Sequence, residues 1–171
     1  MTVNCISYAS NRPLYIGEDV LRTVKYADLQ NPNSHQLPAK HKLHEQSPNV
    51  QGTVLWYAAA VVNNPGNYAK LLQNNYWRYP ALQPLMPFID DKAPKKPRSL
   101  KVSWSDDGCL LHWKAPKGKG WENEAYKYVV YRFGPDEEID LDNPTKIVAI
   151  TYQPAIRLNY NGGETKYTYV V

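Results

Sequence analysis

The length, composition and charge of the chain indicate a folded protein and argue against a nucleic-acid-binding one. Of its 171 residues, 43% are hydrophobic and 12% aromatic, which is enough for a packed core. Basic residues exceed acidic ones only slightly in both halves, eight to six in 1–93 and twelve to ten in 94–171. The net charge of +4 is therefore spread over the chain, and we expect no nucleic-acid partner.

The sequence also lacks the marks of membrane insertion and of export. No apolar stretch is long enough to span a bilayer, and the first residues lack the charged and then apolar order of a signal peptide. Cys5 and Cys109 lie far apart in the sequence, so we expect no disulfide between them. These features predict a chain with neither a membrane span nor a signal peptide of its own.

Residues 1–93 predict an alternation of strands and helices. We expect the tail of a helix at 1–10, strands at 13–17 and 50–57, and helices at 34–46 and 64–77. Strands separated by helices usually pair in parallel. The unbroken apolarity of TVLWYAAAVV is typical of a strand that is buried on both faces.

The helix expected at 34–46 carries two histidines that do not form a recognisable metal site. His41 and His44 are three residues apart, whereas the helix of zinc proteases needs a spacing of four and an intervening glutamate. Lys40 and Lys42 alongside favour a solvent-facing helix. Because the glycines of the chain also match turns better than a phosphate-binding loop, we expect neither a metal nor a cofactor.

The pattern changes after a proline-rich stretch, KAPKKPR at 92–98, which is typical of a stiff solvated linker. Beyond it apolar residues recur with period two in six short runs separated by turn residues. The runs are SLKVSW, CLLHWKAP, YKYVVYRF, TKIVAITY, AIRLNY and KYTYVV. Six short strands at this spacing predict an antiparallel β-sandwich.

The second half resembles a fibronectin type III domain over residues 94–171. Trp113 lies where that family places its core tryptophan, YVVYR at 128–132 matches the third strand, and Tyr167 takes the tyrosine-corner position in the sixth. The family continues into a seventh strand that pairs with the sixth. The resemblance therefore implies a sandwich that lacks its last strand.

The first half resembles the end of the barrel in the glycosyl hydrolase-like 10 family. The resemblance rests on NRPLYIGEDV, on NVQGTVLWYAAAVVNNPGNYAKLLQ and on WRYPALQPLMPFID. It implies that 13–18 is the seventh and 52–57 the eighth strand of a (β/α)8 barrel. Members of this family are large secreted bacterial proteins in which a fibronectin-like domain often follows the barrel.

Glu18 is the catalytic candidate that this resemblance suggests. It follows the expected seventh strand, and active sites of such barrels lie at the carboxyl ends of the strands. Glycoside hydrolysis normally needs two carboxyl groups on either side of the bond, and the adjacent Asp19 cannot be the second one. The alternative for Glu18 is a solvated acidic residue that begins a loop.

Aromatic residues supply the candidates for substrate binding. Trp56 and Tyr57 end the expected eighth strand, where a ring can stack on the apolar face of a sugar while its polar edge stays wet. The alternative is that these two rings belong to the core. Asp19, Tyr26 and Asn11 are further candidates for contacts with a substrate.

We therefore expect an α+β chain of two domains. Residues 1–93 are expected to be the terminal βα units of a glycosidase-like barrel. Residues 94–171 are expected to be a fibronectin type III-like, immunoglobulin-like β-sandwich without its last strand.

The expected function is that of the C-terminal portion of a secreted, polysaccharide-directed glycoside hydrolase-like protein, without catalytic activity by itself. The whole protein would bind a polysaccharide or oligosaccharide in the periplasm, at the cell surface or outside the cell. Two alternatives stay open: a non-enzymatic carbohydrate-binding or adhesion module, and a structural spacer. Open sheet edges at KYTYVV and in the first half also predict self-association.

Overall fold

A computed structural model describes residues 12–31, 33–89, 91–105, 108–118, 125–159 and 166–171. The chain forms two compact units. The first consists of Met1–Arg78 with Leu82–Ile89, and the second of Tyr79–Ala81 with Asp90–Val171. The helix tail expected at 1–10 and the candidate Asn11 lie outside the described residues.

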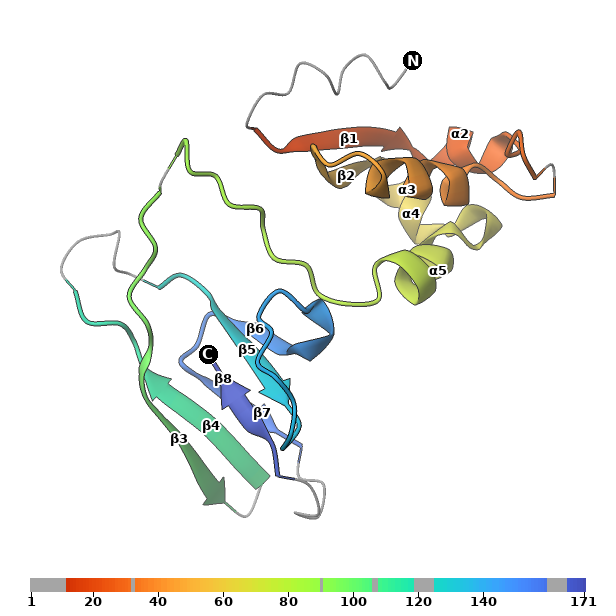
Figure 1. Ribbon diagram of the computed structural model, residues 1–171. Coiled ribbons are helices and arrows are strands. Elements are labelled where there is room, and N and C mark those ends of the chain that lie inside the picture. The colour runs from red at the N-terminus through yellow and green to blue at the C-terminus, as the bar shows by residue number, and fades with distance from the viewer. Residues whose placement is uncertain (1–11, 32, 90, 106–107, 119–124, 160–165) are drawn as a thin grey trace. The chain divides into compact units, whose positions relative to one another are not determined.

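The first unit contains a pair of parallel strands with short helices (Figure 1). The strands are β1 (Leu14–Asp19) and β2 (Val50–Trp56). The helical segments are α2 (Val20–Lys25), α3 (Leu37–Glu45), α4 (Ala58–Val62), the 3-10 turn η1 (Pro65–Asn67), α5 (Tyr68–Leu71) and the π-helical turn η2 (Leu72–Tyr76). The predicted order of strand, helix, strand and helix, and the predicted parallel pairing, are confirmed.

Two helices of the first unit were not predicted. α2 begins directly after β1, with the Asp19 Oδ1 atom accepting a hydrogen bond from the Arg22 backbone N–H at 3.0 Å. The apolar run TVLWYAAAVV is divided, because β2 ends at Trp56 and α4 begins at Ala58. The apolarity that suggested one buried strand therefore belongs partly to a helix.

The core of the first unit lies on one face of the β1–β2 pair. Its buried residues all come from the helices: Val20, Leu37, Ala60, Tyr68 and Leu72. Leu55 of β2 packs against them, while Val54 on the opposite face is 57% exposed. Side chains alternate along a strand, so β1 and β2 present one face to the helices, while on the other face Val54 and Trp56 are exposed among the described residues.

The second unit contains two three-stranded antiparallel sheets, which is consistent with a β-sandwich. One sheet has the order β3 (Arg98–Ser105), β4 (Gly108–Lys114) and β7 (Ala155–Leu158). The other has the order β6 (Ile147–Thr151), β5 (Tyr128–Phe133) and β8 (Thr168–Val170). All six predicted strands are present, and a 3-10 turn, η4 (Pro144–Lys146), precedes β6.

Residues from both sheets form the core of the second unit. Leu111 and Trp113 of β4 pack with Tyr128 and Val130 of β5. The Trp113 and Tyr128 rings meet edge to face with centroids 5.3 Å apart. A second cluster of Tyr131, Phe133 and Ile147 lies on the other face of the β5 sheet. The free thiol of Cys109 is buried beside this core.

Candidate functional site

Two aromatic rings are exposed at the carboxyl end of β2. The Trp56 side chain is 68% exposed and that of Tyr57 46% exposed. Their ring centroids lie 6.5 Å apart with an interplanar angle of 68°, and the peptide bond between the two residues is cis. A flat ligand can therefore stack on one of these amphipathic rings while the other ring borders its edge.

Asp19 lies beside this aromatic pair. It is the last residue of β1, and the parallel register pairs it with Trp56. One carboxylate oxygen caps α2, and the other lies 3.6 Å from the Arg22 Nε atom. The side chain remains 41% exposed, so its carboxylate can still accept a hydrogen bond from a ligand.

Glu18 lies on the opposite face of β1 and is only 5% exposed. Its Oε1 atom accepts a hydrogen bond from the Thr23 hydroxyl at 3.0 Å and lies 3.8 Å from the Lys40 Nζ atom. Lys40 also donates to the Thr23 hydroxyl. The expectation that Glu18 is solvated is therefore wrong, while its catalytic role stays a prediction.

The buried hydroxyl of Tyr68 borders the same carboxylate. Tyr68 is 0% exposed, and its hydroxyl oxygen has no partner in hydrogen-bond geometry among the described residues. Burial, and secondly the nearby Glu18 carboxylate, raise the pKa of the Tyr68 hydroxyl far above its usual value. The phenol is thus held in its protonated form.

His44 and His41 pack against other residues of the first unit. The sequence had instead suggested a helix that faces solvent. The His44 Nδ1 atom lies 3.2 Å from the Thr53 hydroxyl of β2, and the His41 ring stacks on Tyr76 with centroids 4.0 Å apart. Burial lowers the pKa of His44 most strongly, and the neighbouring His41 and Lys40 lower it further against the opposing effect of Glu18. The lowered pKa favours the neutral form of His44. Its ring is one of the polar groups on the face of the β1–β2 pair that the helices cover.

Tyr26, another candidate for substrate binding, lies apart from the aromatic pair. It is 52% exposed at the carboxyl end of α2, with the Lys25 Nζ atom 5.6 Å from its ring centroid. In the part of the chain that the structure describes, it makes no ring contact with Trp56 or Tyr57. The structure thus brings together Asp19, Trp56 and Tyr57, and leaves Glu18 and Tyr26 outside this group.

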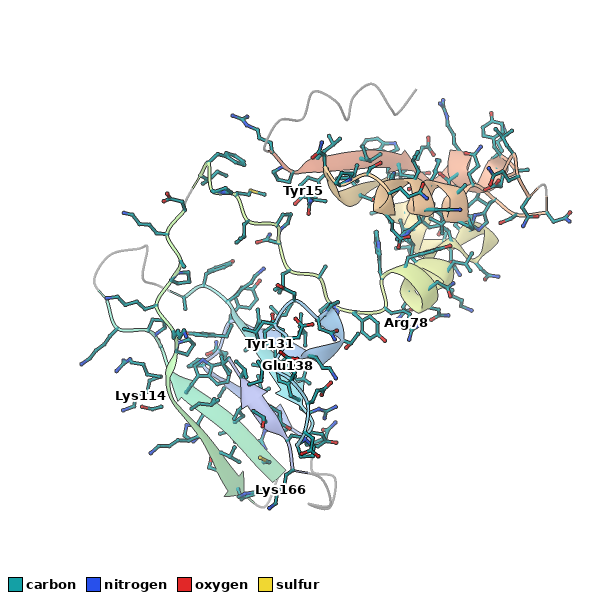
Figure 2. The ribbon with its side chains drawn as sticks, in the orientation of Figure 1. Tyr15, Arg78, Lys114, Tyr131, Glu138 and Lys166 are labelled. Carbon is teal, nitrogen blue, oxygen red and sulfur yellow. The ribbon has the colours of Figure 1, made fainter. Side chains whose placement is uncertain are left out.

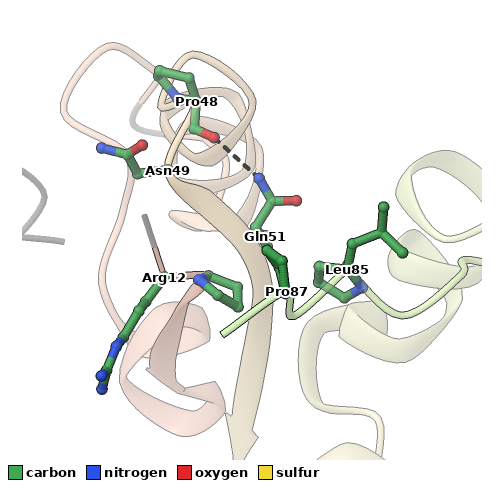
Figure 3. A pocket seen from close by; sticks show the side chains of 8 residues that line it. Arg12, Pro48, Asn49, Gln51, Leu85 and Pro87 are labelled. Carbon is green, nitrogen blue, oxygen red and sulfur yellow. Dashed lines mark hydrogen bonds between the residues drawn. The ribbon is translucent and has the colours of Figure 1, made fainter. Parts of the chain in front are cut away.

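A pocket of about 600 Å³ lies at the other end of the strands (Figure 3). Arg12, Asn49 and Gln51 supply its polar atoms, and Gln51 Nε2 donates to the backbone oxygen of Pro48 at 3.1 Å. Pro84, Leu85 and Pro87 form the remaining wall. No sequence pattern indicated this pocket, because these prolines predicted only irregular chain. The described residues that line it include no pair of titratable groups that could perform acid–base chemistry.

Two further features, a metal site and a membrane-spanning helix, are not found among the described residues. They contain no group of three His, Cys, Asp or Glu side chains that could hold a metal ion. Within the same residues, no helix combines the length and the apolarity needed to cross a membrane.

Comparison with known proteins relates the chain to glycosyl hydrolases. Over 124 residues it is 30% identical to the glycosyl hydrolase YngK of Bacillus subtilis (strain 168). This match covers 71% of the chain and 24% of that protein, so the chain spans about a quarter of the length of the relative. No family model matches the chain, and no solved structure matches it. The predicted relationship to glycosyl hydrolases is thus supported by sequence similarity to a protein of that name.

Proposed function

We propose that this chain is the C-terminal portion of a secreted bacterial glycoside hydrolase-like protein, and that it binds saccharide without cleaving it by itself. The observation that carries the proposal is the group of Trp56, Tyr57 and Asp19 at the carboxyl ends of β1 and β2. The similarity to YngK supports the choice of a carbohydrate as ligand.

The arrangement of the first unit supports its assignment as the last βα units of a barrel. β1 and β2 are parallel, their buried contacts lie with the helices, and Val54 and Trp56 face away from that core. In a closed (β/α)8 barrel the inner faces of eight strands cover one another, and ligands bind at the carboxyl ends. The open face of β1 and β2 corresponds to such an inner face.

The strand order of the second unit supports the proposal of a fibronectin type III-like sandwich. β8 is paired on one side by β5, and in the described residues no strand lies on its other side. Trp113 is 4% exposed in the core, at the place that the resemblance gives to the family's core tryptophan.

The chemistry of the aromatic group matches a sugar ring. Carbon-bound hydrogens make one face of a pyranose apolar, and an indole or phenol ring can cover that face while its polar edge stays in water. The exposed Asp19 carboxylate can accept hydrogen bonds from hydroxyl groups at the rim. These contacts recognise a saccharide but supply no means of protonating the leaving group.

A titration with oligosaccharides tests the binding. Quenching or enhancement of tryptophan fluorescence should show weak affinity, at about millimolar concentration, and Trp56→Ala should abolish the change. Trp77→Ala is the matched control, because Trp77 is 47% exposed in the same unit but follows η2 and belongs to neither strand. Binding that survives Trp56→Ala would place the ligand elsewhere. No binding to any saccharide of a broad panel would favour the alternative of a structural spacer.

A further inference from the structure

Two tyrosine side chains are exposed at one end of the β5–β6 pair. Tyr126 lies shortly before β5 begins, and Tyr152 directly follows the end of β6. The two strands are antiparallel, and the pairing of Tyr128 with Thr151 brings the start of β5 beside the end of β6. Tyr126 and Tyr152 therefore meet although they are distant in the sequence.

The two rings and the side chain of Lys127 form one group at the rim of the sandwich, which we call the rim group. The ring centroids of Tyr126 and Tyr152 lie 5.2 Å apart, with an interplanar angle of 81°. The Lys127 Nζ atom lies 5.8 Å from the first centroid and 5.5 Å from the second. An ammonium group at this distance is attracted by the electrons of both rings, so the three side chains stay together.

The rings of the rim group contribute little to the core. Tyr126 is 75% and Tyr152 58% exposed, whereas Tyr128 and Tyr131 of β5 are each 6% exposed. Figure 2 shows Tyr131 among the side chains that gather around β5 and β6. In the part of the chain that the structure describes, neither tyrosine of the rim group belongs to a buried cluster. Core packing therefore does not account for the rim group.

The backbone beside Tyr152 is held in place by hydrogen bonds. The Thr151 hydroxyl donates to the Gln153 backbone oxygen at 3.3 Å and accepts from the Gln153 backbone N–H at 3.0 Å. The Pro154 backbone oxygen accepts from the Trp113 N–H at 3.0 Å. A ligand that binds the Tyr152 ring thus does not have to order this turn first, and it loses less free energy on binding.

The chemistry of the rim group fits a sugar unit. One ring can cover the apolar face of the sugar while the other ring borders its edge. The two phenol hydroxyls can donate and accept hydrogen bonds, and the Lys127 ammonium group can donate to sugar oxygens. The similarity to YngK supports a saccharide as the ligand.

We propose that Tyr126, Lys127 and Tyr152 form a second saccharide-binding site of the chain. This site lies on the second unit, whereas Trp56 and Tyr57 belong to the first. The choice of a saccharide as ligand rests on the proposed function, while the site itself rests on the geometry of the second unit. Contacts with two rings and one ammonium group should give weak affinity, at about millimolar concentration.

Amide NMR spectra of the complete 171-residue chain test the proposal, because they report on each site separately. The probes are cellotetraose, chitotetraose and oligogalacturonate, which are neutral, N-acetylated and acidic. With at least one probe, the amide signals of Lys127 and Tyr152 should shift and reach saturation. In Tyr126→Ala/Tyr152→Ala the shift at Lys127 should require an about tenfold higher concentration of the probe or disappear. The shifts at Trp56 and Tyr57 should persist in this variant.

Two further variants serve as controls. Tyr126→Phe/Tyr152→Phe keeps both rings, so it should bind more tightly than the alanine variant. Tyr167→Ala removes another tyrosine of the second unit, one that contacts Tyr169 and stands outside the rim group, and it should leave the shift at Lys127 unchanged. Circular dichroism and thermal melting establish that each variant is folded.

The outcomes separate this proposal from the one for the first unit. Shifts at Trp56 and Tyr57 without shifts in the rim group would overturn the second site and leave the proposed function standing. Shifts at Lys127 that persist unchanged in Tyr126→Ala/Tyr152→Ala would also overturn it. Shifts confined to the rim group would support the second site and contradict the site at Trp56. The absence of any shift with all three probes would contradict both.

Discussion

Adjacent acidic residues of β1 have opposite surroundings. Glu18 is buried against Thr23, Lys40 and the Tyr68 hydroxyl, whereas Asp19 is accessible beside Trp56. A buried carboxylate needs compensating donors, and Thr23 and Lys40 supply them. These contacts join β1 to α2 and α3, so Glu18 holds these three elements together in the described structure.

The Tyr68 hydroxyl predicts a dependence of stability on alkaline pH. Burial raises its pKa above the usual 10.0, so the folded chain keeps a proton that the unfolded chain loses. The stability from this difference is fully present below about pH 10 and is lost as pH rises above it. Tyr68→Phe removes a hydroxyl without a hydrogen-bond partner in the described residues, so at neutral pH it should change the free energy of unfolding by less than about 1 kcal/mol.

Urea unfolding of both proteins at pH 8 and pH 11 measures this effect. Between the two pH values the natural chain should lose about 1 kcal/mol more stability than Tyr68→Phe. Equal losses in the two proteins would mean that Tyr68 ionises as readily in the folded chain as in the unfolded one.

At the level of elements, a close contact between helices predicts the effect of glycine substitutions. Gly66 of η1 has a φ of 56°, and a Cβ atom there would lie 2.8 Å from Val24 Cγ1 of α2. Gly66→Ala should therefore lower the free energy of unfolding by about 1–3 kcal/mol. Thermal unfolding measures the change.

Gly17→Ala is the matched control. A Cβ atom at Gly17 meets nothing within 4 Å, and this residue lies in β1, where alanine adopts the backbone conformation without strain. We expect it to be neutral or stabilising by about 0.5 kcal/mol. Equal destabilisation by the two substitutions would contradict the described contact between Gly66 and α2.

Most elements could be predicted from the sequence because their patterns are local. Period-two apolarity identified the six strands from β3 to β8, and the separation of β1 from β2 by a helix indicated parallel pairing. α2 and α4 were missed because each is too short to show a helical period and continues the apolar run of a strand.

The surroundings of the candidate residues could not be predicted in the same way. Alternation places Glu18 and Asp19 on opposite faces of β1, but it does not tell which face the helices cover. Which face of β1 the helices cover depends on contacts of Glu18 with Thr23 and Lys40, and these two residues lie on separate helices. The burial of His41 similarly depends on Tyr76, far along the chain, and its lysine neighbours gave the opposite indication.

At the scale of the whole molecule, the two units carry different kinds of surface. The first presents exposed side chains on one face of a parallel strand pair, with Trp56 and Tyr57 at its carboxyl end. The second packs two three-stranded sheets around a core to which both sheets contribute. The binding of saccharide proposed at Trp56 and Tyr57 therefore concerns the first unit alone and can be tested there.

The distribution of acidic residues predicts that the 171-residue chain does not hydrolyse glycosides at an enzymatic rate. Residues 1–89 contain four acidic side chains: Glu18, Asp19, Asp28 and Glu45. Hydrolysis normally needs two carboxyl groups about 5–10 Å apart on either side of one bond. Glu18 and Asp19 point to opposite faces of β1, so they cannot flank the same bond.

The other two acidic residues of this segment are engaged elsewhere. Asp28 accepts hydrogen bonds from the backbone N–H groups of Gln30 and Asn31, and Glu45 lies 3.4 Å from the His41 ring nitrogen. We therefore expect no release of reducing sugar from a panel of polysaccharides, even where fluorescence shows binding at Trp56. Glu18→Gln and Asp19→Asn serve as controls for any trace of activity. Hydrolysis that either substitution abolishes would show that this chain carries a working carboxylate, and that its partner lies outside residues 1–89.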